Sequence, residues 1–246
     1  MGTREREDAI LDYLREQKEA GVAELASALF VSEPTVRRDL ALLADEGKLI
    51  RTHGGAVFRY GRGENLPQAL RERERSDAKA VIAKKCLSLI SDGDTVMLDG
   101  SSTAAALLPL LAERRSLVAV TNNANAPHLL MDAPVRLFVT GGEPARGTSA
   151  LVGSYAEELL RSFNADVCFF SVRTLTREGL LTDNALAENA VRRVMLSRSR
   201  RRVLMLDSKK LGEACLSTLC DLSGVDLVVS ERDLSECFPD FAEKFL

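Results

Sequence analysis

The chain has 246 residues, 33 basic and 36 acidic side chains, a net charge of -3 and 46% hydrophobic residues, a composition typical of soluble globular proteins. Its length allows a small domain joined to a larger one. No apolar run reaches the roughly 20 residues of a membrane helix, and no apolar signal core follows the start. We therefore expect a cytoplasmic protein that does not contact membranes, and the acidity argues against non-specific coating of nucleic acid.

Few residues are available for metal or hydrolase chemistry. The five cysteines are odd in number, lie mostly in apolar segments and form no Cys-x-x-Cys pair, which favours buried, reduced thiols. Only two histidines occur, His53 and His128, so few residues are available to form a zinc site or a His-dependent catalytic triad. Walker and dinucleotide-binding glycine motifs are missing. We expect no metal, no cofactor and no catalytic residue.

Two helices are predicted at the N-terminus. Residues 4–19 place Ile10 and Leu14 on one side and charged residues elsewhere, and this helix should end near Gly21. A second short helix is expected from Val22 to Leu29, with apolar residues spaced to face a core.

A third helix is predicted over residues 33–46. Ser32 is a good N-cap, Pro34 is tolerated in the first turn, and Gly47 is placed to end the helix. Its apolar residues at i, i+4 and i+7 should face the core. These are Val36, Leu40 and Leu43.

A β-hairpin is predicted next, because two short apolar runs between Lys48 and Phe58 flank the pair Gly54-Gly55. Three helices followed by a hairpin are typical of a winged helix-turn-helix domain. On the third helix Arg37 and Arg38 lie on the solvent side, where an arginine can make two hydrogen bonds to guanine in the major groove. The candidate DNA-contacting residues are Ser32, Thr35, Arg37, Arg38, Lys48, Arg51 and His53.

The alternative for this helix is a solvated surface. Arg37 and Arg38 would then pair with nearby acidic residues, namely Asp39, Asp45 or Glu46. Within residues 33–62, however, six basic positions (37, 38, 48, 51, 59, 62) stand against four acidic ones (33, 39, 45, 46). This local basicity and the order of the elements favour DNA binding. His53 is more consistent with a wing or packing residue than with a catalytic one.

A linker separates two sequence patterns. Residues 59–75 combine glycines with alternating Arg and Glu and lack an apolar face, so we interpret them as a linker that becomes helical. Beyond it, short β-rich runs alternate with helical stretches, which indicates an α/β domain with a mainly parallel sheet. The expected domains are a winged helix-turn-helix over 1–58 and an α/β domain over 76–246.

The expected strands are Thr95–Leu98, Leu117–Thr121, Val135–Thr140, Val167–Val172, Val203–Leu206 and Val225–Val229. The expected helices between them include Lys79–Ile90, Thr103–Glu113 and Leu186–Arg198.

Three loops after predicted strands carry small and polar side chains. Asp99–Thr103 precedes a helix, where exposed backbone N–H groups, the helix dipole and hydroxyls favour a phosphate; a plain turn with an N-cap is the alternative. The loops 121–123 and 140–143 follow two more strands. Because ligands of α/β sheets gather at the carboxyl ends of strands, a pocket for a small ligand is expected there.

Two further groups are open to two interpretations. Lys209 and Lys210 follow the strand Val203–Leu206, so a lysine either reaches the same rim and neutralises an anion or is merely solvated. Glu188 and Arg192 are four residues apart on a predicted helix, which suits a surface ion pair or binding of sugar hydroxyls.

These motifs resemble the DeoR family of bacterial transcriptional regulators over essentially the whole chain. The N-terminal matches are TVRRDL at 35–40 and RTHGGA at 51–56. The matches to the family's effector-sensing domain are Lys79 with IA at 82–83, GDT at 93–95, DGSST at 99–103, VTNN at 120–123, GG at 141–142 and DSKKLG at 207–212.

The resemblance implies a homo-oligomeric repressor of a carbohydrate catabolic operon that binds a double-stranded DNA operator. Its second domain would have the fold of sugar-phosphate isomerases and would bind a phosphorylated sugar or a related metabolite, which alters operator affinity. By motif, residues 100–103 would hold the phosphate and Lys210 would meet the anion or the sugar. The implied effector residues are Asp99, Gly100, Ser101, Ser102, Thr103, Asn122, Gly141, Gly142, Glu188 and Lys210, with Glu188 and Arg192 as weaker matches.

The chain also departs from the family pattern. It has FSVRT at 170–174 where a small Gly-rich segment is common, and Arg192 and Lys209 stand where lysine and serine are usual. Arg173 could add a second anion contact. Two alternatives remain open: activation instead of repression, and an isomerase activity that would use Glu188 and Asp99 for proton transfer.

Overall fold

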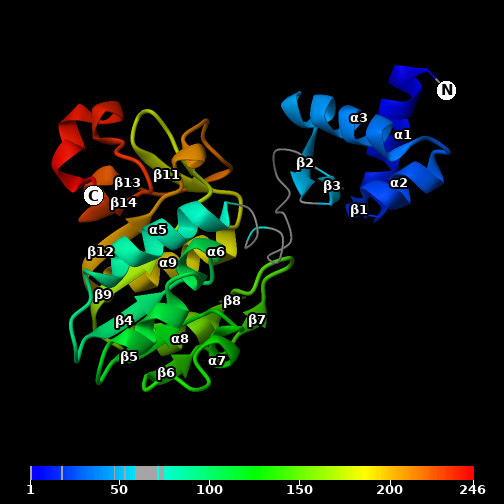
Figure 1. Cartoon of the computed structure of the whole chain (residues 1–246). Helices are drawn as coiled ribbons and strands as arrows, with labels where there is room; N and C mark the ends of the chain where they lie inside the picture. The colour runs from blue at the N-terminus through cyan, green and yellow to red at the C-terminus, as the bar shows by residue number, and fades with distance from the viewer. Residues whose placement is uncertain (1, 18, 47, 53, 59–70, 72–74) are drawn as a thin grey trace. The chain divides into compact units, whose positions relative to one another are not determined.

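The computed structural model of the chain describes residues 2–17, 19–46, 48–52, 54–58, 71 and 75–246. The chain divides into two compact units, residues 1–62 and 63–246 (Figure 1). None of the helices in the described part of the chain is long and apolar enough to cross a membrane.

The first unit consists of three helices and a small antiparallel sheet. Its elements are α1 (Thr3–Gln17), β1 (Glu19–Gly21), α2 (Val22–Ala28), α3 (Glu33–Asp45), β2 (Leu49–Thr52) and β3 (Gly55–Phe58). The three predicted helices and the hairpin are confirmed, and the apolar faces of the helices meet in one core that includes Ile10, Leu14 and Leu40.

Strand β1 was not predicted, and it pairs with β3 so that the sheet order is β1-β3-β2. Gly55 makes this pairing possible. A Cβ atom at Gly55 would lie 2.0 Å from the carbonyl oxygen of Ala20, and such a contact is sterically forbidden. The second glycine of the Gly-Gly pair therefore serves strand pairing as well as the turn.

The second unit is built around a six-stranded sheet with the order β14-β12-β9-β4-β5-β6. Its strands are β4 (Thr95–Leu98), β5 (Val118–Thr121), β6 (Arg136–Val139), β9 (Ala165–Phe170), β12 (Ser199–Met205) and β14 (Leu227–Val229). Every neighbouring pair is parallel, which confirms the six predicted strands and the α/β fold class.

Helices cover both faces of this sheet (Figure 1). They are α5 (Ser76–Leu87), α6 (Ser102–Ala105), α7 (Ala126–Leu129), α8 (Ser154–Arg161) and α9 (Leu186–Ser197). Alternate strand residues point to opposite faces: Val96 and Leu98 pack with α5, whereas Met97 packs on the side of α8 and α9. Two apolar layers therefore enclose the sheet.

Smaller elements complete the second unit. They are the antiparallel strands β7 (Glu143–Pro144), β8 (Leu151–Val152), β10 (Thr174–Leu175), β11 (Leu180–Asp183) and β13 (Ser217–Asp221) and the 3₁₀ turns η1 (Leu108–Glu113), η2 (Ser208–Lys210), η3 (Leu222–Gly224), η4 (Ser235–Cys237) and η5 (Pro239–Lys244). The three-stranded sheet β10-β11-β13 was not predicted.

Two predictions about this unit were wrong in part. The single helix expected over Thr103–Glu113 is broken, because α6 ends at Ala105 and η1 follows. Pro109 explains the break, since its ring excludes the carbonyl group of Ala105 from an α-helical position. The five thiols are free, but only Cys86 and Cys168 are buried, and Cys237 is exposed.

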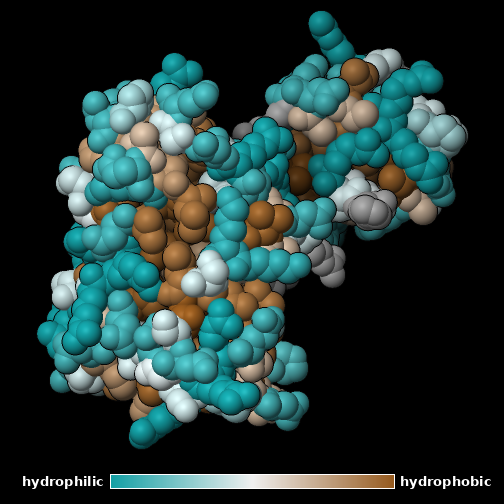
Figure 2. All heavy atoms as spheres, turned by 60° about the vertical axis from the view of Figure 1, so that its left-hand side comes forward, coloured by the Kyte–Doolittle hydropathy of each residue, from teal (hydrophilic) through white to brown (hydrophobic). Residues whose placement is uncertain are grey.

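The surface of the second unit is not uniformly polar. Figure 2 shows apolar side chains gathered as a band on the face that it presents, between charged regions. Large apolar side chains that remain exposed in this unit include Met131, Tyr155, Leu186 and Leu216. Exposed apolar surface of this extent is typical of places where proteins associate.

Candidate functional site

The N-terminus of α3 is fixed by its capping residue. Ser32 accepts a hydrogen bond from the backbone N–H of Thr35 at 3.4 Å, and the hydroxyl groups of the two residues lie 2.8 Å apart. Ser32 is exposed and Thr35 is half-buried. Both candidate phosphate contacts therefore lie at the first turn of the helix, where the dipole favours an anion.

The two arginines of α3 have different surroundings. Both are exposed, but Arg37 forms an ion pair with Glu33 one turn earlier, at 2.6 Å. Among the described residues Arg38 has no ion-pair partner, and Asp39 is buried against Arg6. The alternative in which Arg37 or Arg38 pairs with Asp39, Asp45 or Glu46 is wrong for the described residues. Arg38 is thus the arginine available to a base edge.

The hairpin contributes further cations. Lys48 is exposed and pairs with Glu46 at 2.7 Å, a contact that raises the pKa of its ammonium group. Arg51 lies exposed on β2. His53, the last candidate DNA-contacting residue, lies outside the described residues.

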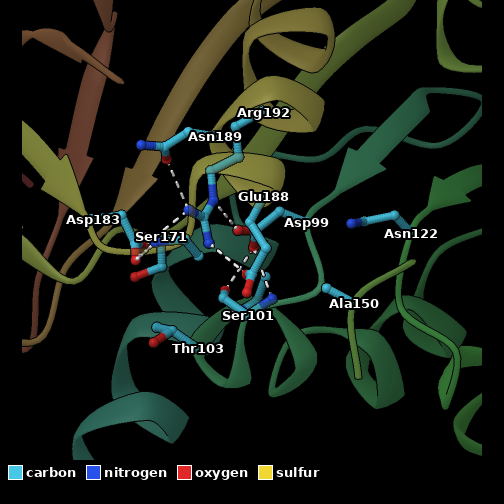
Figure 3. Close-up of polar contacts among 12 residues, drawn as sticks. Asp99, Ser101, Thr103, Asn122, Ala150, Ser171, Asp183, Glu188, Asn189 and Arg192 are labelled. Carbon is cyan, nitrogen blue, oxygen red and sulfur yellow. Dashed lines mark hydrogen bonds and ion pairs between the residues drawn. The ribbon is translucent and has the colours of Figure 1, made fainter. Parts of the chain in front are cut away.

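The candidate effector residues lie at one edge of the parallel sheet. Asp99 follows β4, Asn122 follows β5, Gly141 follows β6, and Ser171 and Asp207 follow β9 and β12. Because the strands are parallel, all these loops leave the sheet at its carboxyl end. Figure 3 shows several of these side chains together with α9, which supplies Glu188 and Arg192.

Arg192 is the centre of a buried polar cluster (Figure 3). Its Nε donates to Asp99 Oδ2 at 2.8 Å, its Nη1 to Asp183 Oδ2 at 2.9 Å, and its Nη2 to Glu188 Oε2 at 3.0 Å. Asn189 also accepts a hydrogen bond from Nη1. All five residues are buried, so the surface ion pair expected for Glu188 and Arg192 is wrong: the helix lines the site.

The carboxylates keep the guanidinium charged. They raise the pKa of Arg192 in spite of its burial. Burial raises the pKa of Glu188, with Asp183 and Asp99 acting in the same direction and Arg192 against it. The charge of Arg71 also acts on Glu188, so two guanidinium groups and three carboxylates share this part of the site.

Lys210 supplies a further cation, whose charge interacts with that of Asp99. Its Nζ donates to Ser171 Oγ at 2.8 Å and to Thr103 Oγ1 at 3.4 Å, and it forms no ion pair within the described part of the chain. Burial lowers the pKa of Lys210 to about 8, helped by the nearby charge of Lys79 and opposed by Asp99 and other carboxylates. Its direct partners are therefore neutral hydroxyls, a setting that an anion would complete.

The Asp99–Thr103 loop has less freedom than its sequence suggests. The Ser101 hydroxyl donates to Asp99 Oδ1 at 2.6 Å and accepts from the Ala104 N–H at 3.1 Å, so Ser101 caps α6. Gly100 packs against Ala150, because a Cβ at Gly100 would lie 2.6 Å from Ala150 Cβ. Ser102 and Thr103 are buried in α6. Of these hydroxyls, only that of Thr103 contacts Lys210.

The loops after β5 and β6 keep unused polar atoms. Asn122 Nδ2 donates to the Leu151 carbonyl at 2.9 Å, but Asn122 Oδ1, Asn123 Nδ2 and Thr140 Oγ1 are buried without a hydrogen-bond partner among the described residues. Gly142 has a φ of 120°, which a side chain would strain. Gly141 and Gly142 directly follow Thr140. The edge of the sheet where the sequence predicted a ligand pocket therefore carries buried polar groups without a hydrogen-bond partner among the described residues.

Several residues of the site were not predicted. Asp183 and Ser171 had no assigned role, and Asn189 was not considered. Asn189 and Glu188 precede Arg192 by three and four residues, so helical spacing alone could have placed Asn189 on the same face. Nothing in the sequence signals Asp183, because it reaches Arg192 from β11 of the second sheet. No group of metal-ligating side chains occurs among the residues described.

Comparison with known proteins agrees with both units. Residues 6–60 match the family model of the DeoR-like helix-turn-helix domain, and residues 74–232 match that of the DeoR C-terminal sensor domain. The chain is 30% identical over 239 residues to the L-fucose operon activator of Haemophilus influenzae, covering 97% of this chain and 96% of that one. It is also 30% identical to the lactose phosphotransferase system repressor of Staphylococcus epidermidis, covering 95% and 94%.

A solved structure shares the fold at low identity. The translation initiation factor eIF-2B of Pyrococcus horikoshii superposes with a TM-score of 0.51 at 14% identity, over 94% of this chain and 82% of that one. Ribose 5-phosphate isomerase A of Methanocaldococcus jannaschii gives a TM-score of 0.43 at 18% identity, over 56% and 55%.

Proposed function

The chain belongs to the DeoR family of transcriptional regulators, and from that premise we propose that it represses a carbohydrate catabolic operon and leaves its operator when a phosphorylated sugar binds the second unit. It is a DNA-binding regulator by family. The relatives compared above include an activator and a repressor, and repression is the direction proposed for this chain.

The proposed DNA interface is the exposed side of α3 with the wing. Arg38 would read a base in the major groove, Ser32 and Thr35 would contact a phosphate, and Arg37 would do so after leaving Glu33. Lys48, Arg51 and His53 would add contacts from the wing. The absence of an ion-pair partner for Arg38 among the described residues supports this assignment.

The proposed effector site is the carboxyl end of the parallel sheet. The single observation that carries it is Lys210, an ammonium group whose direct partners are two neutral hydroxyls and whose pKa is lowered by burial and by Lys79. A phosphate group would supply the missing counter-charge. The carboxylates around Arg192 and the unpartnered Asn122 Oδ1 would accept or orient sugar hydroxyls.

We propose that the second unit binds its ligand without turnover. An isomerase would need a free acid and base, and the candidates were Asp99 and Glu188. Both carboxylates accept hydrogen bonds from Arg192, so both are engaged within the chain rather than positioned as a free acid and base. A turnover assay on pentose and hexose phosphates tests this point, and product formation that Glu188→Gln abolishes would contradict it.

We further propose a homo-oligomer that acts in the cytoplasm, where bacterial operators are. One short recognition helix covers too few bases to be selective, so two-fold operators require two copies. The apolar band in Figure 2 supports association between copies. Sedimentation of the full chain tests this expectation.

The decisive experiment is fluorescence anisotropy of the full chain on labelled DNA from upstream of its own gene. It is titrated first with salt and then with glucose 6-phosphate, galactose 6-phosphate, ribose 5-phosphate and inorganic phosphate. Tight binding that a scrambled site does not share, relieved by one sugar phosphate, is expected. Binding without sequence preference at physiological salt would contradict the regulator, whereas specific binding that no phosphate relieves would contradict the effector class.

A further inference from the structure

Arg75 is the first residue of the continuously described part of the second unit, and its side chain is paired with the loop that carries Lys210. We propose that Arg75, through its ion pairs with Asp207 and Glu231, is the joint that transmits effector binding at Lys210 to the DNA-binding unit. The inference rests on the proposed function, since it concerns how that site is regulated.

The geometry at Arg75 is tightly determined. Its Nε donates to Asp207 Oδ2 at 3.0 Å, and its Nη2 donates to Glu231 Oε1. Both carboxylates are nearly buried, with exposed fractions of 7% and 10%. The backbone of Arg75 has a φ of 54° and lies in the left-handed region, which is uncommon for a non-glycine residue.

The same two carboxylates build the turn that ends in Lys210. Asp207 caps η2 by accepting from the Lys209 N–H at 3.0 Å, and its carbonyl accepts from the Lys210 N–H at 2.8 Å. Glu231 accepts from the Ser208 N–H at 3.0 Å and from the Ser208 hydroxyl. A shift of Lys210 toward an anion therefore changes the position of the groups that hold Arg75.

A second link joins the site to the same stretch of chain. Lys79 lies one turn into α5, where its N–H donates to the Arg75 carbonyl at 3.1 Å, and its ammonium group donates to the carbonyl of Arg71. The charge of Lys79 also acts on Lys210. An anion bound near Lys210 attracts Lys79 as well, so it acts on this part of the chain through Lys79 in addition to Arg75.

The path by which the effect reaches the first unit follows from the order of the chain. Residues 59–74 connect β3 of the first unit to Arg75, and any rearrangement of η2 that alters the Arg75 ion pairs alters the point where this connection is anchored. Coupling between two sites requires an element with which both interact. Arg75 meets that requirement, because it contacts the effector loop through Asp207 and continues into the connecting chain.

The test separates binding from coupling in the full chain. Arg75→Gln removes both ion pairs, Arg75→Lys keeps one charge, and Arg202→Gln is the matched control. Arg202 also forms a two-pronged ion pair, with Asp226, in which both N–O distances are 3.0 Å. Asp226 directly precedes β14, whereas Glu231, the partner of Arg75, follows that strand. For each protein, operator affinity is measured by anisotropy and sugar-phosphate binding by calorimetry, with thermal unfolding as a check of folding.

In the wild type and Arg202→Gln, the active sugar phosphate should lower operator affinity about 5- to 150-fold, the usual range of allosteric coupling. Arg75→Gln should still bind the sugar phosphate and the operator, but the ratio of its operator affinities with and without the sugar phosphate should approach one. The ratio for Arg75→Lys should lie between those of the wild type and Arg75→Gln. An unchanged ratio in Arg75→Gln, or loss of sugar-phosphate binding in that variant, would overturn the proposal. A wild type that responds to no phosphate would instead overturn the proposed effector class.

Discussion

Arg6 in α1 holds the buried carboxylate of Asp39 in α3, with Nη2 and Oδ1 3.0 Å apart. The contact joins two helices across 33 residues of sequence. It also occupies the carboxylate that follows Arg38 in the chain. Helix α3 thereby turns Asp39, one of its three acidic residues, inward and leaves Arg37 and Arg38 exposed, so this carboxylate does not pair with either arginine.

Arg38→Ala should weaken binding to the matched operator by about 1–3 kcal/mol and reduce the preference over a scrambled site, because a two-pronged contact to guanine is lost. Arg37→Ala is the matched control, since it removes an equal charge that already pairs with Glu33, and it should weaken both DNAs alike. Anisotropy on the two DNAs measures this. Equal losses on both DNAs for Arg38→Ala would assign it to a phosphate.

Phe30→Gly should stabilise the first unit by about 1 kcal/mol. Phe30 has a φ of 54° and is 95% exposed, so it bears the strain of a left-handed residue without burial to offset it. Glycine relieves that strain, although it also adds freedom to the unfolded chain. Urea unfolding measures the change, and Phe30→Ala, which retains a Cβ, should show no such gain. A less stable Phe30→Gly would mean that the side chain packs against something in solution.

Effector affinity should fall about tenfold between pH 7 and pH 9. The pKa of Lys210 is lowered to about 8, so the ammonium loses its proton in this window while a phosphate ester remains doubly charged. Calorimetry with the active sugar phosphate measures this, and Lys210→Arg should show a flat profile because arginine stays protonated. A wild-type affinity independent of pH would exclude Lys210 as the anion contact.

The same pKa has a consequence for stability without effector. Because the unfolded chain holds the Lys210 proton more tightly than the folded one, this residue adds stability as the pH rises from about 8 toward the ordinary value near 10.5. Lys210→Met should remove that part of the pH dependence in urea unfolding.

Gly100→Ala should destabilise the second unit by about 1–3 kcal/mol, the usual cost of overpacking. Its Cβ would lie 2.7 Å from Ala150 Cα, which is backbone and cannot rotate away. Gly141→Ala is the control, since a Cβ there meets nothing within 4 Å. Thermal unfolding of both variants measures the difference. Equal stability of the two would show that the Ala150 segment moves freely.

Arg192→Met should cost about 3–5 kcal/mol at neutral pH, because three buried carboxylates lose their shared cation. Without the charge of Arg192, which lowers the pKa of Glu188, burial raises this pKa further, so the folded variant binds more protons than the unfolded one and becomes more stable as the pH falls. Urea unfolding at pH 5 and pH 8 measures this. Arg193→Met, which changes an exposed neighbour that donates to the Thr218 carbonyl, should leave stability nearly unchanged at both values.

Local sequence determined the elements and their order. Ser32 and Pro34 mark the start of α3 because capping and proline geometry act within one turn. The apolar runs of the four inner parallel strands stand out because most of their residues are buried. The motifs at 99–103, 122–123 and 141–142 predicted the edge of the sheet where the candidate site lies. These signals lie within a few residues of one another, so they can be recognised in a single sequence.

Only the tertiary structure decided which charges meet. Asp99 and Arg192 are 93 residues apart, Arg75 and Asp207 132 apart, and no periodicity connects such positions. The pairing of Arg192 with Asp183 depends on the second sheet, β10-β11-β13, whose short strands could not be predicted from the sequence. The sequence determined which polar groups follow each strand; the packing of α9 and of the Arg75 segment onto the sheet determined that Arg192 became a buried hub and that Lys210 retained no carboxylate among the described residues.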